Sequence, residues 1–240
     1  MTVSRDVLVS LLKLTQTGPI SRDSVRRDSR VPVQVLNRYL SELSRSNMIN
    51  EDAGSIELTP SQRIRIAFLA LRAGTDFRRV CTMLSWSEFE KIAADTFELN
   101  GYEIIKNFHF KHGSRRWEMD ILAFEKPSII CADCKHWKHG WRKAATVKAA
   151  QAQNDRTEAF THALPNYMQK MKLEKWQTAK VVPMILSLEA GPVKFFYGVP
   201  IVPVLQLQDF INELPANDHL LKSFCQNNLS QSGDLQKFIK

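Results

Sequence analysis

The chain lacks the long apolar runs and the dense cysteines that mark membrane proteins and disulfide-rich secreted proteins. Its longest apolar stretches, residues 181–188 and 193–205, are shorter than the ~20 residues that a membrane-spanning helix needs. Arg5 and Asp6 interrupt the first apolar residues, so no secretory signal is expected. Four cysteines among 240 residues do not indicate a disulfide framework. We therefore expect a cytoplasmic protein.

The composition is that of a soluble globular protein with a surplus of basic charge. The hydrophobic fraction of 44% and the charged fraction of 24% are ordinary for this class. The length of 240 residues fits one large domain or two small ones. The formal net charge is +8, from 33 Lys and Arg against 25 Asp and Glu. Between residues 106 and 148, 10 basic residues face 4 acidic ones. This local excess favours an anionic partner, and DNA is the partner we expect.

The first 75 residues show a pattern of three helices, a hairpin and a further helix. Apolar periodicity predicts helices at 3–14 and 32–45, with a short polar helix between them that starts at the N-cap Ser21. Two short apolar segments around a polar turn predict a β-hairpin at 48–58. The segment 59–62 then combines a capping threonine, a first-turn proline and a capping-box glutamine, which starts the next helix.

This order resembles the winged helix-turn-helix domains that bind DNA, including the hairpin that runs into a Leu-Thr-Pro helix start. The resemblance implies a small winged-helix domain at 1–80, whose helix at 32–45 enters the major groove. The residues that we expect to contact DNA from this helix are Gln34, Asn37, Arg38 and Arg45. Winged helices also serve as protein-interaction or dimerisation modules, so this alternative stays open.

Residues 81–240 show the alternation of an α/β domain. Its elements are expected as a helix at 86–97, strands at 102–106, 117–124 and 128–135, a helix at 144–164, strands at 181–188 and 199–205, and a helix at 208–214. This order predicts an α/β sandwich around a mixed sheet. Pro183, Pro200 and Pro203 place the last two strands nearer an edge or a bulge than the sheet centre.

Charged residues stand inside two apolar strands of this domain. Asp120 lies within the run 117–122, and Asp133 and Lys135 end the run 129–135. Side chains alternate along a strand, so Asp133 and Lys135 point to the same face. Burying such charges is costly unless they are paired or bind a metal. Carboxylate oxygens suit Mg²⁺, which usually takes one or two protein carboxylates and keeps several waters.

The succession of Phe89-Glu90, Gly101-Tyr102, Asp120 and Asp133-Cys134-Lys135 resembles the PD-(D/E)xK nucleases, and among them the Mrr-type restriction endonucleases and the archaeal Holliday-junction resolvases. The resemblance implies a restriction-endonuclease-like mixed sheet flanked by helices. It assigns Glu90, Asp120 and Asp133 as ligands of Mg²⁺ or Mn²⁺, and Lys135 as the residue that orients the attacking water and steadies the phosphate charge. Met119 in place of proline, and Asp133 in place of the commoner glutamate, depart from the family pattern.

A basic rim beside these residues is expected to contact DNA. Its members are Lys111, Arg115, Arg116, Lys138 and Arg142. Gln151 and Gln153 on the following helix offer further polar contacts.

Three alternatives compete for the same residues. Glu90 can belong to a capping box with Ser87, as Glu88 can with Ser85. Asp120 and Asp133 can be ion-paired in a protein that keeps the fold without activity. The series Cys131, Cys134, His136 and His139 has spacings that can suit zinc, although a strand at 128–135 would send the two cysteines to opposite faces.

The sequence thus predicts a divalent-metal-dependent DNA endonuclease that hydrolyses phosphodiester bonds in repair, recombination or restriction. The alternative is a non-catalytic DNA-binding regulator or repair scaffold. Cutting both strands is simplest with two sites related by a two-fold axis. The apolar segment with Phe195, Phe196 and Tyr197 offers a surface for such a homodimer, or it packs within the monomer.

Overall fold

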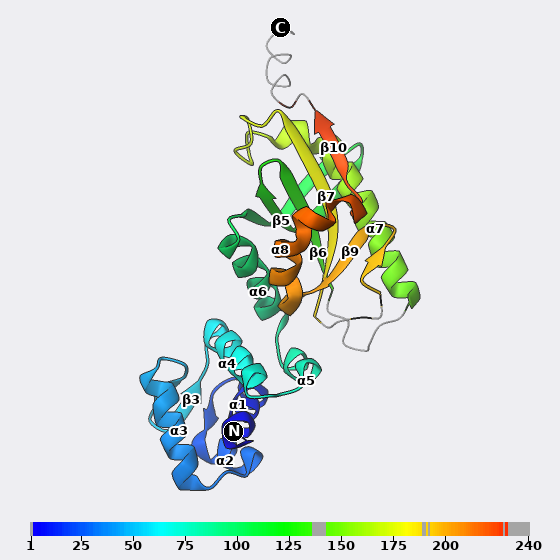
Figure 1. Ribbon diagram of the computed structural model, residues 1–240. Coiled ribbons are helices and arrows are strands. Elements are labelled where there is room, and N and C mark those ends of the chain that lie inside the picture. The colour runs from blue at the N-terminus through cyan, green and yellow to red at the C-terminus, as the bar shows by residue number, and fades with distance from the viewer. Residues whose placement is uncertain (1, 136–142, 189–190, 192, 228, 230–240) are drawn as a thin grey trace. The chain divides into compact units, whose positions relative to one another are not determined.

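A computed structural model describes residues 2–135, 143–188, 191, 193–227 and 229. The chain divides into two compact units, Met1–Ile92 and Ala93–Lys240, whose elements are labelled in Figure 1. The division falls inside helix α6 (Trp86–Leu99), and the domain boundary near residue 80 stays a prediction. Among the described residues, no helix is both long enough and apolar enough to cross a bilayer.

The first unit combines helices with a small antiparallel sheet. Its helices are α1 (Thr2–Leu14), α2 (Arg22–Ser29), α3 (Val33–Arg45), α4 (Pro60–Arg72) and α5 (Phe77–Thr82). Its strands are β1 (Ile20–Ser21), β2 (Asn50–Asp52) and β3 (Ser55–Glu57). The sheet has the order β1-β3-β2, and both pairs are antiparallel. The sequence pattern did not predict β1, because two residues carry no alternation.

Capping signals in the sequence set where these helices begin. The Ser21 hydroxyl accepts a hydrogen bond from the Ser24 N–H at 3.1 Å at the start of α2. Thr59 and Gln62 form the reciprocal capping box at the start of α4. One face of α3 is buried through Leu36, Leu40 and Leu43. The opposite face of α3 is exposed and carries the predicted DNA contacts Gln34, Asn37, Arg38 and Arg45.

An ion pair joins α2 to the hairpin of this unit. Arg22 Nη2 donates to Glu51 Oε2 at 2.7 Å, and this bond lowers the pKa of Glu51. A carboxyl whose pKa is depressed by folding stabilises the fold above its unfolded pKa, and that contribution is lost as the pH falls through the folded pKa. We expect Glu51→Gln to lower the melting temperature at about pH 7 and to leave it unchanged at about pH 2. An equal decrease of the melting temperature at both pH values, measured by thermal unfolding, would contradict an electrostatic contribution of this ion pair.

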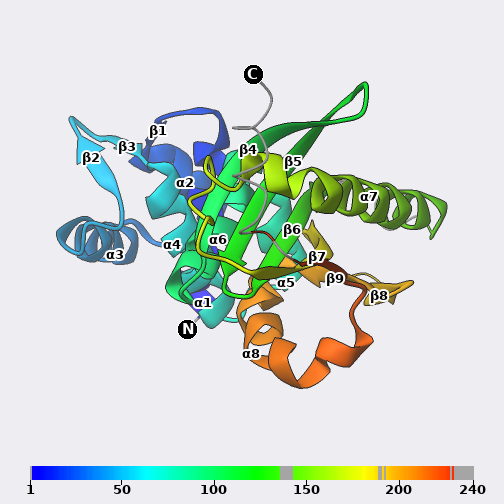
Figure 2. The same cartoon turned by 90° about the horizontal axis from the view of Figure 1, so that it is seen from above.

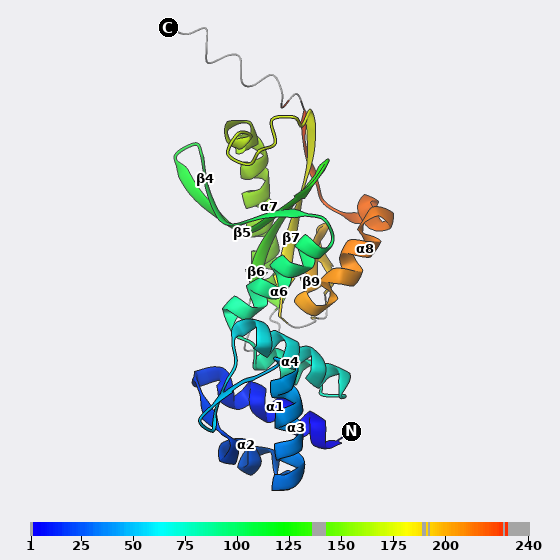
Figure 3. The same cartoon turned by 90° about the vertical axis from the view of Figure 1, so that its left-hand side faces the viewer.

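The second unit contains a mixed sheet with helices on both faces. Its strands are β4 (Glu103–His112), β5 (Arg115–Glu125), β6 (Ser128–Lys135), β7 (Thr178–Ser187), β8 (Phe195–Phe196), β9 (Val199–Pro203) and β10 (Phe224–Asn227). The order is β4-β5-β6-β7-β9-β8, and β10 pairs with β7. Helix α7 (Lys143–Ala163) covers one face and α8 (Leu207–Asn217) lies on the other, as Figures 2 and 3 show. The predicted α/β sandwich around a mixed sheet is confirmed.

Strand direction changes across this sheet. β4, β5 and β6 are antiparallel neighbours, whereas β6, β7 and β9 run parallel. The crossover from β6 to β7 contains α7, which packs on the sheet through aromatic side chains. Phe160 of α7 meets Phe108 and Phe110 of β4 edge to face, with ring centroids 5.9 and 5.4 Å apart. The same core cluster includes Met119 of β5 and Cys131 of β6, so α7 packs against the strands that carry the predicted acidic residues.

The proline argument is wrong for β7, which lies between β6 and β9. β10 pairs with Thr178–Val181 and β9 with Ile185–Ser187 of this strand. Pro183 pairs with Cys131 of β6 on one side. On the other side it falls in the gap between β10 and β9, where the N–H that proline lacks has no strand partner to bind. β9 does lie near an edge, because only the two-residue strand β8 follows it in the sheet.

Candidate active site

Asp133 is a buried carboxylate between two cations. It lies on β6 and is 3% exposed. Lys135 Nζ lies 2.6 Å from Asp133 Oδ2, and Arg156 Nη1 donates to Oδ1 at 2.5 Å. Lys135 is two residues further along the same strand, so the alternation of side chains places it on the face of Asp133, as predicted. The protein itself thus compensates the Asp133 charge through ionic hydrogen bonds.

Asp120 is the second carboxylate of the site. The β5–β6 ladder ends with Ile121 opposite Ala132, and the next residues along the two strands are Asp120 and Asp133. Asp120 Oδ2 accepts a hydrogen bond from the backbone N–H of Cys134 at 2.7 Å. Burial raises the pKa of Asp120, and the charge of Asp133 raises it further against the opposing Cys134 N–H, Lys135 and Arg156. A divalent cation would stabilise the charged form of this buried carboxylate.

The backbone is irregular where Asp120 stands. The β4–β5 pairing passes from Lys106–Ile121 to Phe108–Met119 and omits Asn107 and Asp120. Asn107 has a φ of 51°, a left-handed conformation that asparagine adopts more readily than most residues. Met119 and Leu122 both belong to the core cluster that includes residues of α7, although they are three positions apart. The alternation of core-facing side chains therefore shifts by one residue here, while the register of β4 and β5 is the same on both sides of the interruption.

Helix α7 contributes a cation that the sequence analysis missed. Arg156 donates to Asp133 and also to Gln153 Oε1, at 2.9 Å. Gln153 is fully buried, and its Nε2 donates to the Cys131 carbonyl at 2.6 Å. Gln153 therefore positions Arg156 instead of meeting DNA directly. A signal for Arg156 existed in the sequence, because it falls on the helical stripe of Gln153 and Phe160, where an arginine is unexpected.

Glu88 and Glu90 have different partners in the structure. Glu88 Oε2 accepts the Ser85 N–H at 2.7 Å, and Glu88 Oε1 lies 2.5 Å from Arg63 Nε. The capping box is therefore that of Ser85, and Glu88 has a structural role. Glu90 Oε1 accepts a hydrogen bond from Trp86 Nε1 at 2.6 Å, and its assignment as a metal ligand stays a prediction.

The carboxylates that the structure places together are two in number, Asp120 and Asp133. Over the described ranges, no group of three or more His, Cys, Asp or Glu residues is arranged to hold a metal ion. Two carboxylates match what Mg²⁺ usually takes from a protein, because waters complete its coordination. The donor set is composed of oxygen atoms, which suits Mg²⁺ or Mn²⁺ better than zinc.

The zinc alternative depends in part on His136 and His139, which lie outside the described residues. Cys131 and Cys134 are three positions apart on one strand, and alternation sends them to opposite faces. Burial also raises the pKa of the Cys131 thiol, which disfavours the thiolate that binds metals.

The basic rim is described at the end of the β4–β5 hairpin. Lys111 pairs with Arg116, and His112 with Arg115, on the two strands. All of these side chains are exposed, and the Arg115 guanidinium lies 3.6 Å from the centre of the Trp117 ring. The other predicted rim residues, Lys138 and Arg142, lie outside the described residues.

Comparison with known proteins adds a family similarity. Residues 85–203 match the model of the nuclease-related domain family, NERD, and this range includes Asp120, Asp133, Lys135 and Arg156. An uncharacterized protein of Archaeoglobus fulgidus is 25% identical over 134 residues, which are 55% of this chain and 92% of the relative. Over its second unit the chain is thus similar to nuclease-related proteins.

Two solved structures show weak similarity. The protein of unknown function AF1548 is 18% identical with a TM-score of 0.26, over 41% of this chain and 46% of that one. The protein VC1899 from Vibrio cholerae is 13% identical with a TM-score of 0.36, over 91% of this chain and 53% of that one. The matches therefore span about half the length of these two proteins.

Proposed function

We propose that this chain, similar over residues 85–203 to nuclease-related domains, is a divalent-metal-dependent DNA endonuclease. The observation that carries the proposal is the meeting of Asp120, in the middle of β5, with Asp133 and Lys135 of β6, where the pairing of these two strands ends. Buried carboxylates with a neighbouring lysine in this arrangement are suited to phosphodiester hydrolysis. The proposal includes the resemblance to Mrr-type endonucleases and junction resolvases. The proposed substrates are therefore DNA duplexes or DNA junctions.

The residues of the proposed site have different roles. Asp120 and Asp133 would hold Mg²⁺ or Mn²⁺, with Glu90 as a further proposed ligand. The ion, when bound, would neutralise the carboxylates and stabilise the charge that develops on the phosphate. The Lys135 side chain is 35% exposed, so its ammonium can reach a water or a phosphate from the solvent side. Arg156 is more buried and is held by Gln153, which suits it to orienting Asp133.

Plasmid nicking tests this proposal most simply. Supercoiled DNA incubated with the protein should be nicked in the presence of Mg²⁺ or Mn²⁺ and should stay intact with EDTA. The competing function is a non-catalytic DNA-binding scaffold, which would bind the same DNA and leave it uncut. Failure to cut supercoiled, branched and single-stranded DNA under all metal conditions would favour that scaffold.

We also propose that the first unit is a winged helix that presents α3 to DNA. Three helices followed by the β2–β3 hairpin give the chain order of that fold, and β1 completes the small sheet. The exposed side of α3 offers amides and guanidinium groups to a groove. Val33 and Val35, 53% and 43% exposed on the same helix, would suit apolar contact with thymine methyl groups or a protein partner.

The salt dependence of binding separates these two roles of α3. Changing Arg38 and Arg45 together to alanine should weaken duplex binding and reduce its log–log salt slope by roughly 1 per lost phosphate contact. Arg72→Ala, at an exposed position of α4, is the matched control and should change neither quantity by as much. Unchanged affinity of the double variant across several salt concentrations would assign α3 to a protein partner.

A homodimer is a further proposal, because cutting both strands is simplest with two sites. Phe195 and Tyr197 of the predicted surface are exposed in the monomer. A monomeric mass by light scattering at micromolar concentration, with and without DNA, would contradict the dimer.

A further inference from the structure

The β8–β9 hairpin holds an aromatic side chain open to solvent on a strained turn. Tyr197 is 84% exposed and has a φ of 48°, a backbone region that bulky residues seldom adopt. Gly198 follows at a φ of 78°, and a Cβ there would lie 2.8 Å from the Lys222 backbone nitrogen. Lys222 N–H donates to the Gly198 carbonyl at 2.8 Å. The turn is therefore fixed against residue 222 while its tyrosine ring points away from the core.

A pocket of about 370 Å³ extends from this turn to helix α7. Its lining combines Phe196 and Tyr197 from the hairpin, Gln151 and Asn154 from the helix, and Lys222. The two aromatic rings meet edge to face with centroids 4.5 Å apart. The lining thus offers aromatic surface, two amides and one ammonium group, and its volume falls within the range of small-molecule sites.

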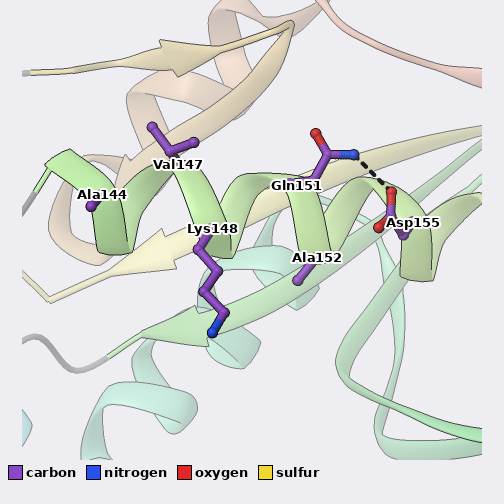
Figure 4. A pocket seen from close by; sticks show the side chains of 6 residues that line it. All are labelled: Ala144, Val147, Lys148, Gln151, Ala152 and Asp155. Carbon is purple, nitrogen blue, oxygen red and sulfur yellow. Dashed lines mark hydrogen bonds between the residues drawn. The ribbon is translucent and has the colours of Figure 1, made fainter.

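The polar lining continues along α7. Gln151 also borders an open hollow on the outer side of this helix, where its Nε2 donates to Asp155 at 2.9 Å. Lys148 lines the same hollow, and Figure 4 shows that its side chain and that of Gln151 leave the helix in opposite directions. Two turns of the same helix carry Gln153 and Arg156 of the candidate active site. The pocket and the candidate active site thus share helix α7.

We infer that the pocket binds an unpaired nucleobase of single-stranded DNA, stacked on Tyr197. Exposed aromatic rings bind bases of any sequence, because every base has a π face. Glutamine and asparagine amides can pair with base edges, and Lys222 can contact the adjoining phosphate. Paired bases in a duplex present no free face, so the ligand is an overhang, a flap or an unpaired nucleotide at a branch. This inference rests on the proposed nuclease function and specifies its substrate class.

The test measures binding without cleavage. A short single strand that contains 2-aminopurine is titrated in EDTA, and a blunt duplex of equal length serves as the reference ligand. Tyr197→Asn removes the ring but keeps a residue that tolerates the left-handed backbone, and Tyr197→Phe keeps the ring. We expect Tyr197→Asn to weaken single-strand binding about tenfold and to lose the fluorescence quenching, whereas Tyr197→Phe retains both. Duplex affinity and melting temperature should stay unchanged in both variants.

The possible outcomes separate this inference from the proposed function. Wild-type affinity of Tyr197→Asn for the single strand would overturn the base pocket, even if the protein cuts DNA. An equal loss of single-strand and duplex binding would also overturn it. Tyr197-dependent binding in a protein that cuts no DNA would support the pocket and contradict the nuclease proposal. A dimer by light scattering that Tyr197→Asn converts to a monomer, without loss of single-strand affinity, would assign the surface to a second copy instead.

Discussion

Asp120→Ala is expected to abolish DNA cleavage while the affinity for DNA stays unchanged or rises. Asp133 has both carboxylate oxygens engaged by Lys135 and Arg156, so Asp133 alone should hold the ion more weakly than the two carboxylates together. We expect the single-turnover cleavage rate to fall by at least about 100-fold, the scale of losing one charge-stabilising group at an active site. Binding should persist because the variant removes a negative charge that repels phosphate and leaves the basic hairpin intact.

Companion variants identify what each neighbour contributes. Lys135→Ala should also abolish cleavage, but it should weaken binding slightly because a cation is lost. Glu90→Ala should reduce the rate while the melting temperature changes little. Glu118→Ala is the matched control, because Glu118 lies two residues from Asp120 on the same strand and is 53% exposed. If Asp120→Ala mainly lowers the melting temperature and the wild type does not nick DNA, the cluster is structural.

Arg63→Met is expected to destabilise the first unit by about 3–5 kcal/mol, the scale of breaking a buried ion pair on one side. Arg63 and Glu88 are 5% and 2% exposed, and their Nε and Oε1 atoms lie 2.5 Å apart. The Arg63 guanidinium also donates to the Leu12 carbonyl at 2.8 Å, the Thr15 hydroxyl at 2.5 Å and the Met83 carbonyl at 2.6 Å. One side chain thus joins four segments of the unit.

Urea unfolding of single and double variants measures this effect. Arg63→Met leaves the Glu88 carboxylate buried without its cation, and Glu88→Gln leaves the guanidinium without its anion. The double variant removes both charges, so it should be less destabilised than the sum of the two single changes. If Arg63→Met lowered the free energy of unfolding by less than about 1 kcal/mol, the ion pair would contribute no more than a solvent-screened surface pair.

Most elements of the second unit were predictable because their patterns are local. Strand β6 has the predicted bounds, Ser128–Lys135, since it is a short apolar run that ends in polar residues. Asp120, Asp133 and Lys135 stood out because a charge inside an apolar strand needs a partner. Strands β8 and β10 were missed because segments of two and four residues show too little alternation.

The partners of the site were less predictable because they depend on long-range packing. The helical stripe of α7 marks Arg156 as facing the sheet, but it does not say which strand Arg156 meets. That contact depends on how the aromatic core sets α7 over β4–β6, which no local pattern contains. The sequence likewise did not decide between the capping boxes of Glu88 and Glu90. In the structure Glu88 is held by an ion pair with Arg63, and local patterns do not show a contact with a residue so far away in the chain.

The most direct test of the central claim is a comparison of Mn²⁺-dependent nicking by wild type and Asp120→Ala protein, purified and assayed identically. The account predicts that wild type converts supercoiled plasmid to the nicked form only when Mn²⁺ or Mg²⁺ is present. It also predicts that Asp120→Ala binds the plasmid but leaves it supercoiled. Equal nicking by both proteins, or its absence from both while DNA is bound, would contradict a metal-dependent active site at Asp120 and Asp133.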